Sequence, residues 1–170
     1  MKIVAAAYDV LVAALAVLAG VAIMLAFVLI VFEVSLRGLG IRPPAFPSAM
    51  VEYLLLYFAL LPAPYLVRKK GHVYIDAIVV RVPAGLRRVL EYFSYITCIG
   101  ICLLFAYIGY LLAADAIRFS MIDQRAIDLP LYLLYLPFPI VFTMVAIEFA
   151  RFLFGSETMY VPATQPKESL

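Results

Sequence analysis

The order of apolar and charged positions divides the chain into four long apolar segments separated by short polar ones. Val10 to Phe32, Tyr92 to Ala114 and Leu129 to Ile147 contain no charged residue, and Tyr53 to Val67 is a shorter segment preceded by Glu52. A helix needs about 20 predominantly apolar residues to cross the hydrocarbon layer of a membrane. The pattern therefore predicts four transmembrane helices. They are expected at about residues 10–36, 48–67, 92–114 and 129–151.

The segment between the second and third predicted helices has a different, amphipathic pattern. At 100° per residue, one side of a helix would carry Ile75, Val79, Val82 and Leu86. The opposite side would carry Arg81, Arg87 and Arg88. We expect an arm helix over about residues 73–91 that lies in the membrane interface, with its arginines among the phosphates of membrane lipids. A helix docked on a protein partner is the alternative interpretation.

Composition agrees with an integral membrane protein and excludes several other classes. The chain has 170 residues, of which 67% are hydrophobic and 14% are charged, whereas a soluble domain averages about 45–50% and about 25%. A net charge of +2 is too small for a nucleic-acid surface. Two cysteines are too few for a disulfide scaffold. We therefore predict an all-α integral membrane protein with one membrane domain over residues 1–154 and a polar tail over residues 155–170.

The placement of basic residues predicts the orientation of the chain. If both termini are cytoplasmic, nine of the 13 Lys and Arg residues lie on the inner side. Cytoplasmic loops of membrane proteins carry an excess of Lys and Arg. We therefore expect the N- and C-termini in the cytoplasm.

Few residues in the chain could perform chemistry. His72 is the only histidine, and Cys98 and Cys102 lie one helical turn apart with no other soft ligand nearby in the sequence. We expect no catalytic site, cofactor or metal. At the outer end of the first helix, Glu33 and Arg37 have the spacing of an ion pair. Arg37 could instead pair with Glu52, or Glu52 could contact a partner subunit.

Three stretches of the chain resemble the small (DctQ-like) membrane subunit of tripartite ATP-independent periplasmic (TRAP) transporters. The first is Arg37 at the end of one span followed by Glu52 at the head of the next. The second is the turn from Arg68 to Asp76, including Gly71 and His72, continued by Val82-Pro83 and Arg87-Arg88. The third is the fourth-span stretch with Pro130, Tyr132, Tyr135 and Pro137, in which Tyr132 stands where the family often has Trp. The resemblance covers about residues 10–152.

This resemblance implies a specific role and specific partners. In that family a periplasmic solute-binding protein delivers an organic acid to a large membrane subunit, which carries the substrate and sodium sites. The small subunit acts as a scaffold in the bacterial inner membrane and helps to receive the binding protein. Two other classes remain as alternatives: a stand-alone four-helix exporter of small molecules, and a membrane enzyme subunit.

Overall fold

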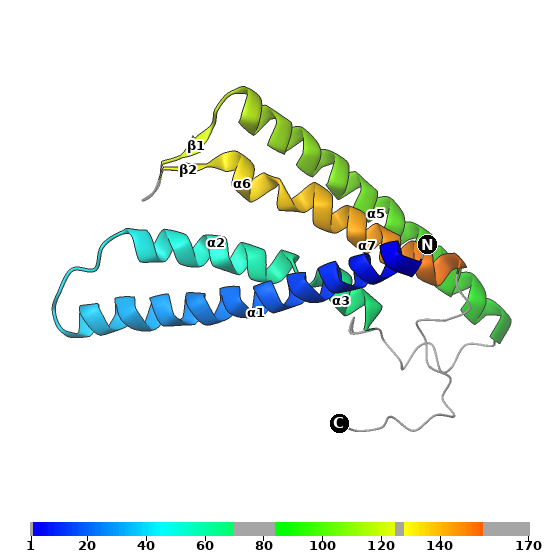
Figure 1. Ribbon diagram of the computed structural model, residues 1–170, viewed down its shortest axis with the longest axis horizontal. Coiled ribbons are helices and arrows are strands. Elements are labelled where there is room, and N and C mark those ends of the chain that lie inside the picture. Colours follow the sequence, from blue (N-terminus) through cyan, green and yellow to red (C-terminus); the bar gives the residue numbers. More distant parts are fainter. Residues whose placement is uncertain (1, 70–83, 125–127, 155–170) are drawn as a thin grey trace, which may run out of the picture.

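The apolar segments form two antiparallel helical hairpins, which are plain in Figure 1. The computed structural model describes residues 2–69, 84–124 and 128–154. The first hairpin consists of α1 (Lys2–Gly38), α2 (Phe46–Leu60) and α3 (Ala63–Arg68). The second consists of α5 (Ala84–Arg118), β1 (Ile122–Asp123), β2 (Leu129–Pro130), α6 (Leu131–Tyr135) and α7 (Pro137–Phe154).

Four stretches of these helices are long and apolar enough to cross a membrane. They are Ala6–Gly38, Phe46–Arg68, Val89–Arg118 and Leu131–Phe154. Each overlaps one of the four segments expected from the sequence, so the prediction of a four-helix integral membrane protein is confirmed. The start of α1 and the end of α7 lie at the same end of the molecule (Figure 1).

Prolines divide the second and fourth spans. α2 ends at Leu60 and α3 begins at Ala63, with Pro62 as the residue before α3 and Pro64 in its first turn. A proline has no N–H to donate and its ring crowds the preceding turn, so a helix changes direction there. In the fourth span, Pro137 begins α7 directly after α6.

At two places the structure differs in kind from the predicted elements. The arm helix was expected to end at Glu91, but α5 runs without a break from Ala84 to Arg118, because no proline interrupts the backbone hydrogen bonds between these residues. Residues 73–83 of the predicted arm lie outside the described residues. The fourth span was expected from Leu129, but Leu129–Pro130 pairs with Ile122–Asp123 as an antiparallel strand. The helix begins after Pro130, whose backbone is extended.

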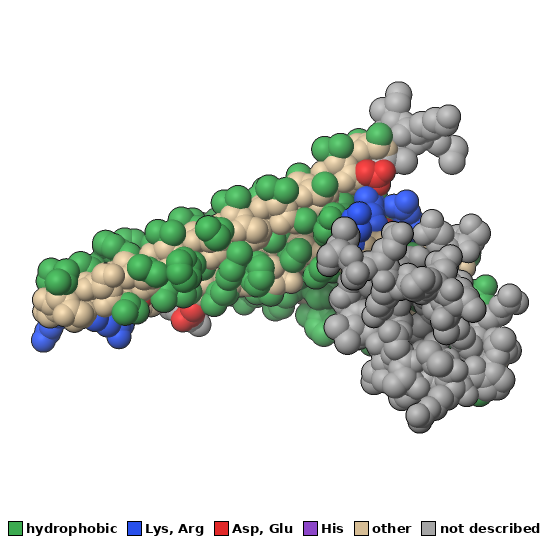
Figure 2. All heavy atoms as spheres, turned by 90° about the horizontal axis from the view of Figure 1, so that it is seen from below, with side chains coloured by type: hydrophobic (Ala, Val, Ile, Leu, Met, Phe, Trp, Pro, Cys, Tyr) green, Lys and Arg blue, Asp and Glu red, His purple; other side chains and the backbone are tan. Residues whose placement is uncertain are grey.

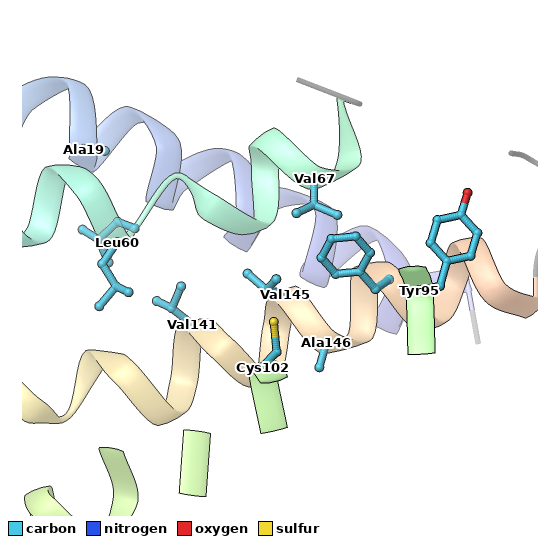
Figure 3. Packing of buried hydrophobic residues seen from close by; sticks show 10 residues of the cluster. Ala19, Leu60, Val67, Tyr95, Cys102, Val141, Val145 and Ala146 are labelled. Carbon is cyan, nitrogen blue, oxygen red and sulfur yellow. The ribbon is translucent and has the colours of Figure 1, made fainter. Parts of the chain in front are cut away.

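The buried core lies where the two hairpins meet (Figure 3). It contains Ala19 of α1, Leu60 of α2, Val67 of α3, and Val141 and Val145 of α7, together with residues of α5. In Figure 3 the sulfur of Cys102 points towards α7. Cys98 packs against the same core, so both cysteines line a helix–helix contact, as expected for small apolar residues.

A close contact between α5 and α7 depends on Gly109. A Cβ atom at this position would lie 2.7 Å from the Cβ atom of Phe138 and 3.1 Å from the Cδ atom of Pro139. Glycine is the residue that lets two helices approach this closely inside a membrane.

The long outer faces of the molecule are apolar. Figure 2 shows hydrophobic side chains along the length of one face, with Lys and Arg side chains gathered at its two ends. Large apolar side chains of α1 such as Val17, Val21, Met24 and Phe27 are exposed. Such a surface fits contact with lipid chains or with another membrane subunit.

Candidate functional site

A charged cluster joins the two hairpins at one end of the molecule, and we name it the charged end. Arg68, the last residue of α3, donates hydrogen bonds from Nη2 and Nε to Oε1 of Glu148 in α7, at 2.6 and 3.1 Å. Its Nη1 atom lies 2.9 Å from Oδ1 of Asp9 in α1. One guanidinium group therefore links the first, second and fourth spans.

Burial makes the bond to Glu148 the strongest part of this cluster. The Glu148 side chain is 2% exposed and that of Arg68 is 22% exposed. Asp9 and Arg151 are about half exposed, and Arg151 lies farther from both carboxylates, at 3.5 Å from Glu148 and 3.9 Å from Asp9. A buried carboxylate without a cation is strongly destabilising, whereas exposed pairs contribute little. Glu148 therefore requires Arg68.

Tyr8 of α1 completes the cluster. The Arg68 guanidinium lies over its ring at 5.3 Å from the ring centre. Its hydroxyl donates to the backbone carbonyl of Met144 in α7, at 3.2 Å. The aromatic face and the hydroxyl thus hold α1 against both α3 and α7.

The break between α2 and α3 brings Arg68 into position. α3 packs against both α1 and α7, with Pro64 and Val67 buried. Because α3 restarts after Pro62, its direction is independent of that of α2. The prolines of the second span therefore place a charged side chain in a helix interface.

Polar bonds also join the hairpins at the opposite end, which we name the β end because β1 and β2 lie there (Figure 1). Tyr53 of α2 donates to Oδ2 of Asp123 in β1 at 3.0 Å. Tyr57, one turn further, donates to the backbone carbonyl of Leu133 in α6 at 2.8 Å. The hairpins are thus linked by polar groups at both ends and by apolar packing between them.

A third polar contact ties α1 to α2 at the β end. Arg37 pairs with Glu33, four residues earlier, which confirms the shorter of the two predicted pairings. Ser48 of α2 donates to both oxygens of Glu33, at 3.1 and 3.0 Å. The connection between these helices therefore passes through Glu33 and Ser48, and a pair between Arg37 and Glu52 stays a prediction.

The other residues that the sequence singled out fall in three places. Gly71, His72, Asp76 and Arg81 lie outside the described residues. Arg87 and Arg88 lie in the first turns of α5. Pro130 precedes α6, Tyr132 and Tyr135 lie within it, and Pro137 begins α7. Of the predicted residues, Arg68 is the one that the structure places at the centre of a cluster.

Sequence reasoning missed Asp9, Glu148 and Arg151. Asp9 directly precedes the first uncharged segment and Glu148 directly follows the last one, so the charge pattern identifies each only as the end of a span. A signal was available: two acidic and two basic residues flank different spans on the same predicted side of the membrane. Opposite charges at the ends of neighbouring helices pair readily.

The described residues contain an apolar hollow, and they contain no group of side chains placed to hold a metal ion. The hollow has a volume of about 250 Å³ and lies at the β end, between the last turn of α5 and the Pro130–Tyr132 segment. Its lining is almost entirely apolar. In the described parts of the chain, no group of three or more His, Cys, Asp or Glu side chains is placed to hold a metal ion.

Four helices that are long and apolar enough to cross a membrane define a multi-pass membrane protein. The sequence matches the family described as "Tripartite ATP-independent periplasmic transporters, DctQ component" over residues 26–158. The chain therefore belongs to the DctQ family and is a small permease subunit of a TRAP transporter. A comparison with curated proteins found no match.

Proposed function

We propose that this chain is the scaffold of a TRAP transporter in the bacterial inner membrane. It holds the large membrane subunit, helps to receive the periplasmic solute-binding protein, and so supports sodium-driven uptake of an organic acid. The observation that carries this proposal is the double linkage of the two hairpins. Arg68 and Glu148 join them at the charged end, and Tyr53 and Tyr57 join them at the β end.

A scaffold must keep its shape while a neighbouring subunit moves. Linkage at both ends resists splaying and sliding of the hairpins, because either motion would break a buried ion pair or a hydrogen bond in a low-dielectric medium. The polar groups of these links are engaged within the chain. Solute and sodium are then handled by the large subunit.

The proposed orientation places the charged end in the cytoplasm and the β end in the periplasm. Arg68, Lys69 and Arg151 lie at the charged end, and more of the Lys and Arg residues fall on that side of the membrane. The β end then faces the periplasmic binding protein. Its apolar hollow beside Tyr132 is a suitable contact for that protein.

The start of α5 supports a contact with the membrane surface. α5 extends beyond the end of α7 (Figure 1), and Leu86, Val89 and Leu90 are exposed there. Arg87 and Arg88 occupy the same turns. We infer that the first part of α5 passes through the cytoplasmic membrane interface with Arg87 and Arg88 at lipid phosphates, and that the arm predicted over residues 73–83 lies along the same interface.

Reconstitution tests the scaffold role. The chain is co-expressed with a large TRAP membrane subunit and its binding protein, purified by a tag on this chain, and placed in proteoliposomes. We expect the large subunit to co-purify and labelled C4-dicarboxylates or sugar acids to enter only with a sodium gradient. Transport by the large subunit alone at the full rate would refute the scaffold role, and export by this chain alone would support the stand-alone exporter.

A further inference from the structure

Two tyrosines of α5 expose their side chains at a depth where lipid offers no hydrogen-bond partner. Tyr107 and Tyr110 are both 61% exposed. The span Val89–Arg118 has 30 residues, or about 45 Å of helix at 1.5 Å per residue. If it is centred in about 30 Å of hydrocarbon, Tyr107 lies about 5 Å and Tyr110 about 10 Å from the bilayer centre along the helix axis.

These hydroxyl groups cannot easily reach the nearer membrane surface. Side chains of a helix lean towards its N-terminus. Both tyrosines are closer to the membrane surface at the β end than to the other surface. The N-terminus of α5 lies in the opposite direction, so their side chains lean deeper into the hydrocarbon layer. Snorkelling, by which long polar side chains reach water, is therefore disfavoured for this pair.

Three other tyrosines of the spans have hydrogen-bond partners within the chain. Tyr8, Tyr53 and Tyr57 each donate a hydrogen bond to the opposite hairpin. Within residues 2–69, 84–124 and 128–154, no such bond joins Tyr107 or Tyr110 to another group. Because an unpaired hydroxyl in hydrocarbon is unfavourable, an acceptor on another membrane protein would satisfy each of them.

Gly100 gives a second, independent indication on the same side of α5. It lies two turns before Tyr107, and a Cβ atom there would meet nothing within 4 Å. Glycine inside a helix is less favourable than alanine by about a factor of five in equilibrium constant, and nothing in the described chain uses the space. A small residue at such a point lets a neighbouring transmembrane helix approach closely.

We propose that this face of α5 is the docking face for the large membrane subunit of the transporter. The α5 face is defined by Ile96, Gly100, Leu103, Tyr107, Tyr110 and Ala114, all of which are exposed and fall within about 80° around the helix. It lies away from the side on which α5 packs against α7. The inference rests on the proposed function, since the large subunit is the membrane partner that the family implies.

The large subunit is favoured over lipid and over a second copy of this chain. Lipid cannot accept the tyrosine hydrogen bonds, whereas broken helices and polar side chains of a transporter subunit offer acceptors at this depth. A second copy would present the same tyrosine hydroxyl groups. When two hydroxyl groups bond to each other, one donates and the other accepts, so one of the two hydrogen atoms stays without an acceptor. The exposed face of α1 around Phe27 also carries a glycine, Gly20, but has no hydrogen-bonding side chain beside it.

Photo-crosslinking in the assembled transporter tests the docking face directly. p-Benzoylphenylalanine replaces Tyr107 in one variant and Phe27 of α1 in the matched control. The two side chains are equally exposed, at 61% and 62%, and lie at similar depths. We expect the probe at position 107 to form an adduct with the large subunit and the probe at position 27 to form none. An adduct from position 27 alone, equal adducts from both, or only a homodimer adduct from position 107 would overturn the assignment.

Association measurements with small changes provide the second readout. Removing one hydroxyl in Tyr107→Phe or Tyr110→Phe should weaken association with the large subunit about threefold, and removing both should weaken it about tenfold. Gly100→Leu should abolish co-purification, whereas Gly20→Leu, at a glycine with equally free surroundings, should leave it unchanged. Thermal unfolding of the isolated chain should occur at the same or a slightly higher temperature in all five variants, which separates docking from folding.

The two proposals fail in different ways. If the unchanged chain does not co-purify with the large subunit, the proposed function is wrong. If the complex forms and transports while the Tyr107 and Gly100 variants behave like their α1 controls, the scaffold role stands and the assignment of the α5 face is wrong.

Discussion

Replacement of Arg68 by methionine tests whether the charged cluster holds the hairpins together. Arg68→Met keeps most of the volume of the side chain and removes its charge. Glu148, which is 2% exposed, then retains only Arg151, which is half exposed and 3.5 Å away. The change therefore leaves a buried carboxylate with one weak partner.

The expected cost follows from that environment. Removing one partner of a buried ion pair costs about 3–5 kcal/mol, and the remaining contact with Arg151 places the expected loss near the lower limit, at about 3 kcal/mol. The double variant Arg68→Met with Glu148→Met removes both charges. It should lie within about 1 kcal/mol of the original chain, because apolar replacement of a complete buried pair is often neutral.

Thermal unfolding of the purified chain in detergent measures this difference. Cys98 is partly buried and Cys102 is buried, so reaction with a maleimide dye reports unfolding without any added label site. For a chain of this size, 3 kcal/mol corresponds to a fall in Tm of about 6–12 °C. Arg151→Gln is the matched control: its longer, exposed contacts predict a loss below about 1 kcal/mol.

The result that would refute this reasoning is a small effect of Arg68→Met or an additive double variant. If the two single changes simply add, Arg68 and Glu148 do not stabilise one another. The hairpins would then be held by the apolar core and the tyrosine hydrogen bonds, and the support that the charged end gives to the scaffold proposal would be lost.

Three further predictions concern other parts of the molecule. Gly109→Ala should lower the free energy of unfolding by about 1–3 kcal/mol because the added Cβ atom would clash with the start of α7. Gly100→Ala is the control and should leave the isolated chain as stable or slightly more stable. Thermal unfolding in detergent distinguishes the two variants. Tyr57→Phe should cost about 1 kcal/mol by removing the bond to a backbone carbonyl of α6, and an unchanged Tm would contradict that bond. Replacing both Arg87 and Arg88 by Glu should reduce solute uptake while the large subunit still co-purifies; full uptake by the inserted variant would argue against the lipid contact.

The spans could be predicted from the sequence because each is a simple run without charge. The exact ends could not. From the sequence, Pro130 could lie in the first turn of a helix or directly before it. The pairing of Leu129 with Asp123 depends on a second strand, which a loop separates from the first. Residues 84–91 show an amphipathic pattern, yet nothing in that pattern decides whether the helix stops before the third span or continues into it.

The charged cluster was harder to predict than the spans. A local sequence motif identified Arg68, but its partners Asp9 and Glu148 are far away in the sequence. Glu148 is separated from Arg68 by 80 positions. Their meeting depends on the change of direction at Pro62 and on the packing of α3 against α7. Long-range geometry of this kind is set by tertiary contacts, which a single sequence pattern does not contain.

The separation of Arg68 from Glu148 also has a consequence for biosynthesis. Chains are made from the N-terminus, so α1, α2 and α3 enter the membrane long before the carboxylate in α7 exists. Until then the guanidinium can pair only with Asp9, and the surface of α3 that later covers α7 is exposed. Arrival of the last helix supplies the missing acid and closes the bundle. A chain cut short before Glu148 would therefore leave Arg68 with Asp9 but without its buried carboxylate partner.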